Sequence, residues 1–357
     1  MEVVQNSRLF WQRKRVLVTG DSGFKGSWLS LWLHELGAEI HGLSLPPDQR
    51  PNLYSLAKVG KISKTQFVDI RQASRVREMV GKIKPQIIFH LAAQPIVRMG
   101  YSQAKETWDT NLNGTIHLLE AARNLLSLKV IVVVTTDKVY RNPEKGVSFV
   151  ESDPLGGKDP YSASKAAADL ATASYHEVFF QKRGVGVATA RAGNVIGGGD
   201  WAKDRIVPDA IRAWGKGKAL VVRNPASTRP WQHVLDSLGG YLSLAEKLWK
   251  NPRLSGAYNF GPESSERKTV RELVQQARGF SRQRKVVWGS STIRPAEARV
   301  LALNNSKAKK RLGFYPAWEF RTAVARTFGW YARQARGGDA RRLCLEDIQA
   351  YEKQALR

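Results

Sequence analysis

The stretch VLVTGDSGFKG, residues 16–26, joins a short apolar strand to a glycine-rich turn and the start of a helix. Gly20, Gly23 and Gly26 let the backbone turn tightly there and approach a pyrophosphate, whose charge is favoured by free N–H groups and the positive end of the helix dipole. An ordinary tight turn is the alternative, but the position directly after the first strand of an alternating series speaks against it. The stretch therefore predicts a dinucleotide-binding fold.

Short apolar segments alternate with helical patterns along the first half of the chain. The longest, KVIVVVT at 129–135, is uniformly apolar, as in a parallel strand covered on both faces. Strands are expected at 15–19, 39–43, 65–68, 86–90, 129–135, 185–190 and 257–261, and helices at 23–36, 104–126, 160–182, 268–278 and 319–336. This alternation predicts an α/β fold with a doubly wound parallel, Rossmann-type sheet.

The pattern becomes less regular after residue 195, where loops rich in glycine or proline occupy 197–201 and 223–230. We expect a smaller C-terminal substrate lobe that is interleaved with the end of the first domain. In this division the dinucleotide-binding domain spans 1–195 with 231–260 returning to it, and the lobe spans 196–230 and 261–357.

The composition of the 357 residues limits the class of protein. Cys344 is the one cysteine of the sequence, which excludes an internal disulfide framework and a cysteine-rich metal site, so no metal is expected. No run approaches the roughly 18 apolar residues of a membrane span, and the first residues contain no apolar signal-peptide region. We therefore expect a cytoplasmic protein without a membrane partner.

The formal net charge of +26 is compatible with a nucleic-acid or other polyanionic partner. The basic residues are scattered, however, with small clusters at 13–15, 307–311 and 333–342. No zinc finger, aromatic RNA-binding signature or long basic arm accompanies them. We favour a solvated basic surface and expect no specific nucleic-acid binding.

A second motif, PYSASK at 160–165, contains a tyrosine and a lysine four residues apart. Tyr161 and Lys165 would share one face of a helix. A free tyrosine has a pKa of about 10, and a nearby ammonium and a positively charged nicotinamide ring would both stabilise its phenolate. Tyr161 is thereby predicted to be a general base toward a sugar or alcohol hydroxyl. The spacing alone is common on surface helices, so the prediction also depends on the glycine turn and on TTDK at 135–138.

Together these motifs resemble the extended short-chain dehydrogenase/reductase (NAD-dependent epimerase/dehydratase) family, and within it the CDP-glucose 4,6-dehydratases. The segments GFKGSW (23–28), RAGNVIGGGDWA (191–202) and RPWQHVL (229–235) are more particular than the glycine turn and the Tyr-Lys pair. The resemblance implies that CDP-glucose becomes CDP-4-keto-6-deoxyglucose plus water through a transient NADH. It also implies a homo-oligomer, dimer or tetramer, and a place in deoxysugar biosynthesis for lipopolysaccharide O-antigen.

The resemblance also implies catalytic roles. Tyr161 would take the 4-hydroxyl proton as NAD+ takes hydride from C4, Asp137 would donate to the departing C6 hydroxyl, and Lys138 would act at C5. The predicted catalytic residues are Thr136, Asp137, Lys138, Tyr161 and Lys165. The competing interpretation of 135–138 is a surface loop with a helix-capping threonine and a solvated ion pair.

NAD is the predicted cofactor, because the second strand ends in HGLSLPP, without an acidic residue for a ribose hydroxyl or an arginine for a 2′-phosphate. Asp21 stands where the family usually has histidine, and its negative charge in the phosphate turn is expected to weaken cofactor binding. The predicted cofactor-binding residues are Gly20, Gly23, Phe24, Gly26, Asp69, Ile70, Leu91, Ala92, Ala93, Thr135, Tyr161 and Lys165. The predicted substrate-binding residues are Asn194, Arg205, Arg229 and Arg294, and an arginine fork suits phosphate oxygens.

Two other functions stay open at this point. A nucleotide-sugar epimerase or reductase of the same fold would need Tyr161 and Lys165 but not the pair Asp137 and Lys138. A non-catalytic dinucleotide-sensing or polyanion-binding module is favoured by the net charge and by Asp21.

Overall fold

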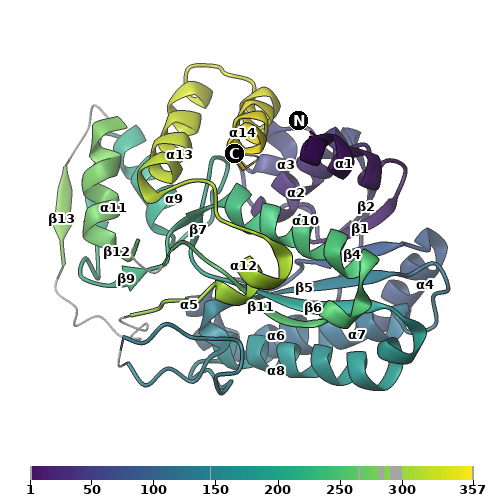
Figure 1. Ribbon diagram of the computed structural model, residues 1–357. Coiled ribbons are helices and arrows are strands. Elements are labelled where there is room, and N and C mark those ends of the chain that lie inside the picture. The colour runs from purple at the N-terminus through teal and green to yellow at the C-terminus, as the bar shows by residue number, and fades with distance from the viewer. Residues whose placement is uncertain (1, 145, 264–265, 281–284, 290–299, 356–357) are drawn as a thin grey trace.

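Seven strands form the central sheet, in the order β11-β6-β5-β4-β1-β2-β3 (Figure 1). They are β1 (Arg15–Thr19), β2 (Glu39–Ser44), β3 (Ser63–Phe67), β4 (Ile87–His90), β5 (Val130–Thr136), β6 (Gly186–Ala192) and β11 (Gly256–Phe260). All neighbouring strands pair in parallel. The computed structural model describes residues 2–144, 146–263, 266–280, 285–289 and 300–355. The predicted doubly wound parallel sheet is confirmed.

Helices cover both faces of this sheet, because successive side chains of each strand point to opposite faces and both sets are apolar. In β1, Val16 and Val18 belong to one buried cluster and Leu17 to another. Figure 1 shows α2 and α10 on one side of the sheet and α7 and α8 on the other. The helices around the sheet are α1 (Glu2–Trp11), α2 (Phe24–Glu35), α3 (Leu53–Leu56), α4 (Ala73–Ile83), α5 (Val97–Ser102), α6 (Ala104–Trp108), α7 (Gly114–Ala122), α8 (Pro160–Tyr175) and α10 (Val234–Lys250). Among the described residues, none of the helices is long and apolar enough to cross a membrane.

Several predicted boundaries differ from the structure, and three of them show a clear structural reason. The helix expected at 104–126 is divided by a π-helical turn (Asp109–Asn113) into α6 and α7. The helix expected at 160–182 leaves α-helical geometry after Tyr175, and Gly184 closes it in the left-handed region at φ 66°. The third strand begins two residues early, because Ser63 already pairs with Ile40 of β2.

Outside the sheet, short strands join segments that are far apart in the sequence. Strand β8 (Leu220–Val222) pairs with β13 (Val286–Trp288), and β9 (Thr228–Arg229) pairs with β12 (Lys268–Thr269). The remaining elements there are β7 (Val195–Ile196), β10 (Gln232–His233), α9 (Ile206–Gly215), α11 (Val270–Ala277), α12 (Ser306–Leu312) and α13 (Phe320–Gln334). These pairings join 220–229 to 268–288, which both belong to the proposed lobe of 196–230 and 261–357, and β11 lies at the edge of the sheet within the proposed return of 231–260.

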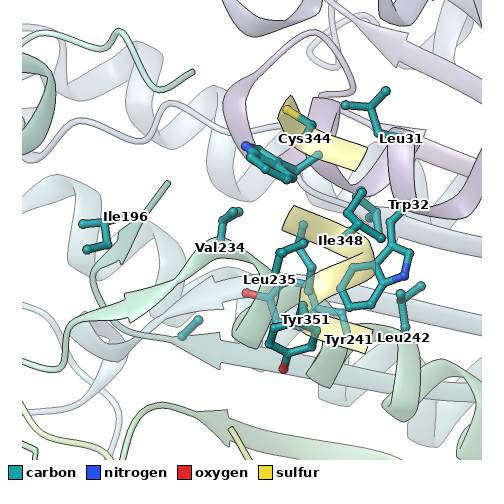
Figure 2. Packing of buried hydrophobic residues seen from close by; sticks show 14 of the residues in the cluster. Leu31, Trp32, Ile196, Val234, Leu235, Tyr241, Leu242, Cys344, Ile348 and Tyr351 are labelled. Carbon is teal, nitrogen blue, oxygen red and sulfur yellow. The ribbon is translucent and has the colours of Figure 1, made fainter. Parts of the chain in front are cut away.

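The C-terminal helix α14 (Ala340–Ala355) was not among the predicted helices, and it packs against the first part of the chain. Its Tyr351 ring lies 5.5 Å from the Trp32 ring of α2, edge to face. Figure 2 shows Ile348 beside these two rings, within the buried cluster that also holds Leu235 and Leu242 of α10. The last 16-residue helix therefore completes the core on the α2 and α10 side of the sheet.

Replacing Ile348 by alanine tests this docking. Ile348 is 1% exposed, so Ile348→Ala leaves a cavity between α14 and α2 and should lower the free energy of unfolding by about 2–5 kcal/mol. Urea unfolding followed by circular dichroism measures the change. The matched control is Gln349→Ala, the exposed neighbour on the same helix, which should change stability little. Equal stability of the two variants would contradict the packing of α14.

Candidate active site

The glycine turn between β1 and α2 has the backbone that its sequence predicts. Gly20 adopts φ 76°, and a Cβ there would lie 2.8 Å from the Ala92 nitrogen. A Cβ on Gly26 would lie 2.1 Å from the Gly20 carbonyl oxygen. Gly23 caps α2 without any side-chain hydrogen bond, so the first N–H groups of the helix stay available to an anion. The turn therefore fits the pyrophosphate of a dinucleotide.

This turn opens onto one large crevice of about 1250 Å³ along the carboxyl ends of the strands. A single small-molecule site usually occupies roughly 300–1,000 Å³, so the volume suits two ligands side by side. The predicted cofactor-binding residues all line it: Gly20, Gly23, Phe24, Gly26, Asp69, Ile70, Leu91, Ala92, Ala93, Thr135, Tyr161 and Lys165. No group of three or more metal-ligating side chains occurs among the described residues.

The segment that follows β5 forms a short 3-10 turn (Asp137–Val139), which Thr136 begins. Thr136 and Lys138 line the crevice, and Asp137 is fully buried beneath them. The Thr136 hydroxyl and the Lys138 ammonium each donate to Asp137 Oδ1 at 3.0 Å. The second oxygen, Oδ2, is buried and has no hydrogen-bond partner among the described residues. An unpaired buried carboxyl oxygen is costly, which makes it a mark of a functional group. The competing interpretation is right about the capping threonine and the ion pair, but wrong about a solvated surface loop, because Asp137 is fully buried.

Helix α8 carries the second half of the predicted catalytic set. Asp159 caps the helix by accepting from the Ser162 N–H at 3.0 Å, and Pro160 occupies its first turn. Tyr161 and Lys165 are both buried one turn apart, and Lys165 Nζ donates to the Val134 carbonyl of β5 at 3.0 Å. The ammonium therefore ties α8 directly to the strand that delivers Thr136.

The electrostatics of Tyr161 differ from the prediction. Burial raises the pKa of Tyr161, and this effect outweighs the lowering by the Lys138 ammonium, the Thr136 hydroxyl bond and Arg205. Burial also lowers the pKa of Lys165 to about 8, although Asp169 opposes the change. The sequence assigned the stabilisation of the phenolate to Lys165, but in the structure the ammonium that lowers the pKa of Tyr161 is that of Lys138.

Asp21 does not face the crevice, contrary to the expectation that its charge lies among the phosphates. Its carboxyl is fully buried on the other side of the turn and accepts hydrogen bonds from Ser44 (2.8 Å), Ser63 (3.1 Å) and Thr65 (2.6 Å). A Cβ on Gly42 would lie 1.8 Å from Asp21 Oδ2, so this site on β2 admits only glycine. Asp21 thus joins the glycine turn to β2 and β3.

The outer end of the predicted cofactor site holds an ion pair. Asp69 accepts from Arg71 Nη2 at 2.6 Å, and this contact holds the pKa of Asp69 below its usual range. Arg71 lines the crevice and also contacts Glu106. Asp69 was predicted alone, and the arginine two residues later was missed because no motif spacing marks it.

Three of the four predicted substrate-binding residues line the crevice: Asn194, Arg205 and Arg229. The fourth, Arg294, lies outside the described residues. Asn194 Oδ1 is buried without a partner among the described residues, so it is free to accept a hydrogen bond from a ligand. Arg205 pairs with Asp200 at 2.9 Å. Its positive charge also acts on Tyr161, the predicted catalytic tyrosine, and opposes the rise in the pKa of that residue.

Lys25 is a site residue that the sequence analysis missed, although it stands inside the quoted glycine turn. Its side chain reaches the crevice and donates to the Tyr241 hydroxyl of α10 at 3.3 Å. Burial, Arg205 and Lys165 lower the pKa of Lys25 to about 7. The glycines alone identify the motif, so no pattern in the sequence assigned a role to the lysine between them. That role depends on the contact with α10, which only the fold creates.

Comparison with known proteins places this geometry among nucleotide-sugar enzymes. A family model described as GDP-mannose 4,6 dehydratase matches residues 17–327. A CDP-glucose 4,6-dehydratase of Salmonella typhimurium is 41% identical over 355 residues, with 96% of this chain and 97% of the relative covered. A dTDP-glucose 4,6-dehydratase of Xanthomonas campestris is 28% identical over 335 residues, with coverages of 88% and 92%.

Solved structures share the fold at lower identity. An epimerase of Methanothermobacter thermautotrophicus superposes with a TM-score of 0.80 at 20% identity, over 94% of this chain and 96% of that one. A dTDP-glucose 4,6-dehydratase of Bacillus anthracis in complex with NAD gives a TM-score of 0.75 at 23% identity, over 90% and 97%.

The buried position of Asp21 generates a prediction about stability. Burial raises the pKa of Asp21 in the folded state above its value in the unfolded chain. Between these two pKa values, the folded chain therefore binds more protons than the unfolded chain. Wild-type stability should therefore fall relative to Asp21→Asn as the pH rises from about 4 to 8. Urea unfolding at several pH values measures the difference. The exposed Asp48→Asn should show no such trend, and a trend of opposite sign for Asp21→Asn would contradict the assignment.

Proposed function

This chain belongs to the GDP-mannose 4,6-dehydratase family, and from that membership we propose that it is an NAD-dependent nucleotide-sugar 4,6-dehydratase that acts on CDP-glucose. The observation that carries the proposal is the cluster of Thr136, Lys138 and Tyr161 on the wall of the crevice, with Asp137 buried beneath it and bonded to Thr136 and Lys138. The 41% identity over 96% of the chain to a CDP-glucose 4,6-dehydratase supports the sugar nucleotide.

The part of the crevice that begins at the glycine turn would hold NAD. The backbone space at Gly20 and Gly26 and the uncapped start of α2 fit its pyrophosphate. When bound, NAD+ supplies hydride acceptance from C4 of the sugar and hydride return to C6. Among the basic side chains that line the crevice, Lys25, Lys138, Lys165 and Arg205 lie close enough to interact, and this group favours anionic ligands such as a dinucleotide and a nucleotide sugar.

In the first half of the reaction Tyr161 removes the proton of the 4-hydroxyl. Its phenolate is stabilised by the Lys138 ammonium, and by the Thr136 hydroxyl when that group turns from Asp137 to donate to Tyr161; both offset part of the effect of burial. Lys165, held by the Val134 carbonyl, keeps a positive charge on the same helix face. The product of this half is a 4-ketone, which acidifies the hydrogen at C5.

In the second half the chain moves a proton from C5 and protonates the departing C6 hydroxyl. Lys138 acts at C5. If a proton of its ammonium passes to Asp137 across their 3.0 Å contact, the neutral amine can remove the C5 proton, and the protonated carboxyl can give its proton to the departing C6 hydroxyl, which leaves as water. If Lys138 keeps its charge, it stabilises the enolate while water removes the C5 proton, and Asp137 must first take up a proton from water. Hydride then enters at C6 and a proton re-enters at C5, so CDP-glucose becomes CDP-4-keto-6-deoxyglucose plus water without net oxidation.

An epimerase or reductase of the same fold needs neither an acid nor a base beside the tyrosine. The ion pair of Lys138 and Asp137 at 3.0 Å, with one carboxyl oxygen left open, favours dehydration over these alternatives. Both halves of the catalytic set are present in the structure, which argues against a non-catalytic sensing or polyanion-binding module.

We also propose a cytoplasmic homo-oligomer, a dimer or tetramer, that serves deoxysugar biosynthesis for lipopolysaccharide O-antigen. Large apolar side chains stand exposed on one group of elements, including Tyr101 on α5, Trp108 on α6 and Leu170 on α8. Apolar area of this kind is typical of a protein interface.

Turnover of CDP-glucose with added NAD+ tests the function directly. The purified protein should produce a base-labile 4-keto sugar nucleotide and water. Deuterium placed at C4 should reappear at C6 of the product, because the same cofactor accepts and returns it. Mass spectrometry and proton NMR measure the transfer. Deuterium that is lost to bulk cofactor, or a product epimeric at C4 that keeps its 6-hydroxyl, would favour a reductase or an epimerase instead.

Two variants separate the halves of the reaction. Lys138→Met should still oxidise C4 but stop before water leaves, so the absorbance of the reduced cofactor accumulates in a single turnover. Tyr161→Phe should block the first hydride transfer, with a loss of about 10²–10⁴-fold in rate. Stopped-flow absorbance distinguishes the two. If Lys138→Met removes water from the sugar at the wild-type rate, the role assigned to Lys138 in the dehydration half of the reaction is wrong.

A further inference from the structure

A buried ion pair lies directly behind the proposed catalytic residues, and the reaction as described above does not use it. Asp169 stands on α8 one helical turn after Lys165, and Arg191 lies on β6. Their side chains form a fork, with Arg191 Nη2 to Asp169 Oδ1 at 2.8 Å and Arg191 Nε to Asp169 Oδ2 at 2.8 Å. Both residues are 4% exposed.

The pair reaches both ends of the segment that carries Thr136, Asp137 and Lys138. On the amino side, the Thr135 hydroxyl donates to Asp169 Oδ2 at 3.2 Å. On the carboxyl side, Arg191 Nη1 donates to the Tyr140 hydroxyl at 2.9 Å. The segment 136–139 is thus attached at its two flanks to one ion pair.

The partners of the pair are themselves held in place. The Tyr140 hydroxyl donates to Asn259 Oδ1 of β11 at 2.6 Å, and the Tyr140 ring stacks on Phe149 with centroids 4.8 Å apart. The Thr189 hydroxyl donates to Asp169 Oδ1 at 3.1 Å. Asp169 therefore receives four hydrogen bonds from three residues, and the network spans α8, β5, β6 and β11.

Stability alone is a weak reason for such a pair. The desolvation of two buried charges commonly cancels their attraction, and apolar residues of similar volume often replace a buried pair without loss of stability. A fully bonded pair instead specifies one relative position of the elements that carry it. Here these elements are α8 with Tyr161 and Lys165, and β5 with the segment that follows it.

The pair also contributes to the charge of Lys165. Burial favours the neutral amine, and among the groups around Lys165 it is the carboxylate of Asp169 that favours the ammonium. The Lys165 charge also acts on Lys25 of α2 and on His90 of β4, and Tyr161 lies one turn before Lys165 on the same helix. Burial lowers the pKa of His90 to about 3, so that ring is neutral and supplies no compensating charge.

We propose that Asp169 and Arg191 are positioning residues: their ion pair holds the Thr136–Lys138 segment in register with Tyr161, and Asp169 places its carboxylate one helical turn after Lys165 on α8. The inference rests on the proposed dehydratase function, since it assigns a role within that same site. Neither side chain touches the crevice, so the pair acts through Thr135, Tyr140 and Lys165.

The test compares the pH dependence of kcat in wild type and Asp169→Asn. Removal of the carboxylate takes away the charge that raises the pKa of Lys165, so the ammonium is lost at lower pH and the alkaline limb of the profile moves to lower pH. We expect kcat to fall about 10- to 100-fold while KM for CDP-glucose changes less than about twofold. Asp169→Glu keeps a carboxylate, so it should restore part of kcat and return the alkaline limb of the pH profile toward its wild-type position.

Asp347→Asn is the matched control. Asp347 is 6% exposed and pairs with Arg326 at 3.2 Å, between α14 and α13 and outside the crevice. Its substitution should lower stability without moving the alkaline limb. Since Asp169→Asn leaves the Arg191 charge buried and unpaired, the double variant Asp169→Asn/Arg191→Met provides the same comparison in a chain without that charge.

Competitive acetylation of Lys165, read by peptide mass spectrometry, tests the inference without any substrate. Lys165 of Asp169→Asn should become reactive at lower pH than Lys165 of wild type. Absence of CDP-glucose turnover in wild type would reject the proposed function, whereas the acetylation profile would still decide the role of the pair. Unchanged kcat, alkaline limb and Lys165 reactivity would overturn the inference. The inference would also be overturned if circular dichroism shows that Asp169→Asn/Arg191→Met does not fold, because the pair would then be needed for the fold itself.

Discussion

Parallel pairing of β4, β5 and β6 is the constraint on which the site depends. Because the three strands run in the same direction, the residues that follow them emerge at one edge of the sheet, and Ala92, Thr136 and Asn194 reach one crevice from three distant parts of the chain. Helix α8 returns along the face of the sheet and brings Tyr161 to the same place. Any slip in the register of β5 against β6 would move Thr136 and Asp137 away from Tyr161.

Burial and nearby charges oppose each other at Tyr161 and Lys165, whereas at Lys25 the neighbouring cations act in the same direction as burial. Burial raises the pKa of Tyr161 and lowers that of Lys165 and Lys25, and so favours the neutral form of each group. Fixed charges work in the other direction: Lys138 favours the phenolate and Asp169 favours the Lys165 ammonium. In so buried a site, Tyr161 can act as a base only because a neighbouring charge, the Lys138 ammonium, favours its phenolate. The local excess of cations also suits anionic ligands better than the scattered basic surface does.

Several features could be predicted because they depend on residues close together in the sequence. The glycine turn, the Tyr161–Lys165 spacing and the uniformly apolar β5 each follow from rules about one strand or one helix. The boundaries at π-helical turns and the helix α14 were missed, since a π-turn and the docking of an amphipathic helix depend on what packs against them. The side chain of Asp21 was placed on the wrong side of its turn, because only the hydroxyls of β2 and β3 show where a buried carboxyl can be satisfied.

By itself, the sequence determined the sheet and its cofactor turn, since backbone freedom at glycine and the alternation of apolar runs are properties of the chain that no neighbour needs to supply. It also determined which side chains could perform acid-base chemistry. Only the tertiary structure decided which of them act together. Asp169 and Arg191 stand 22 residues apart, and Tyr140 meets Asn259 across 119 residues, so no local pattern could join them. The physical reason is that hydrogen bonds and charges act over a few ångströms in space, and folding alone sets which distant residues come within that range.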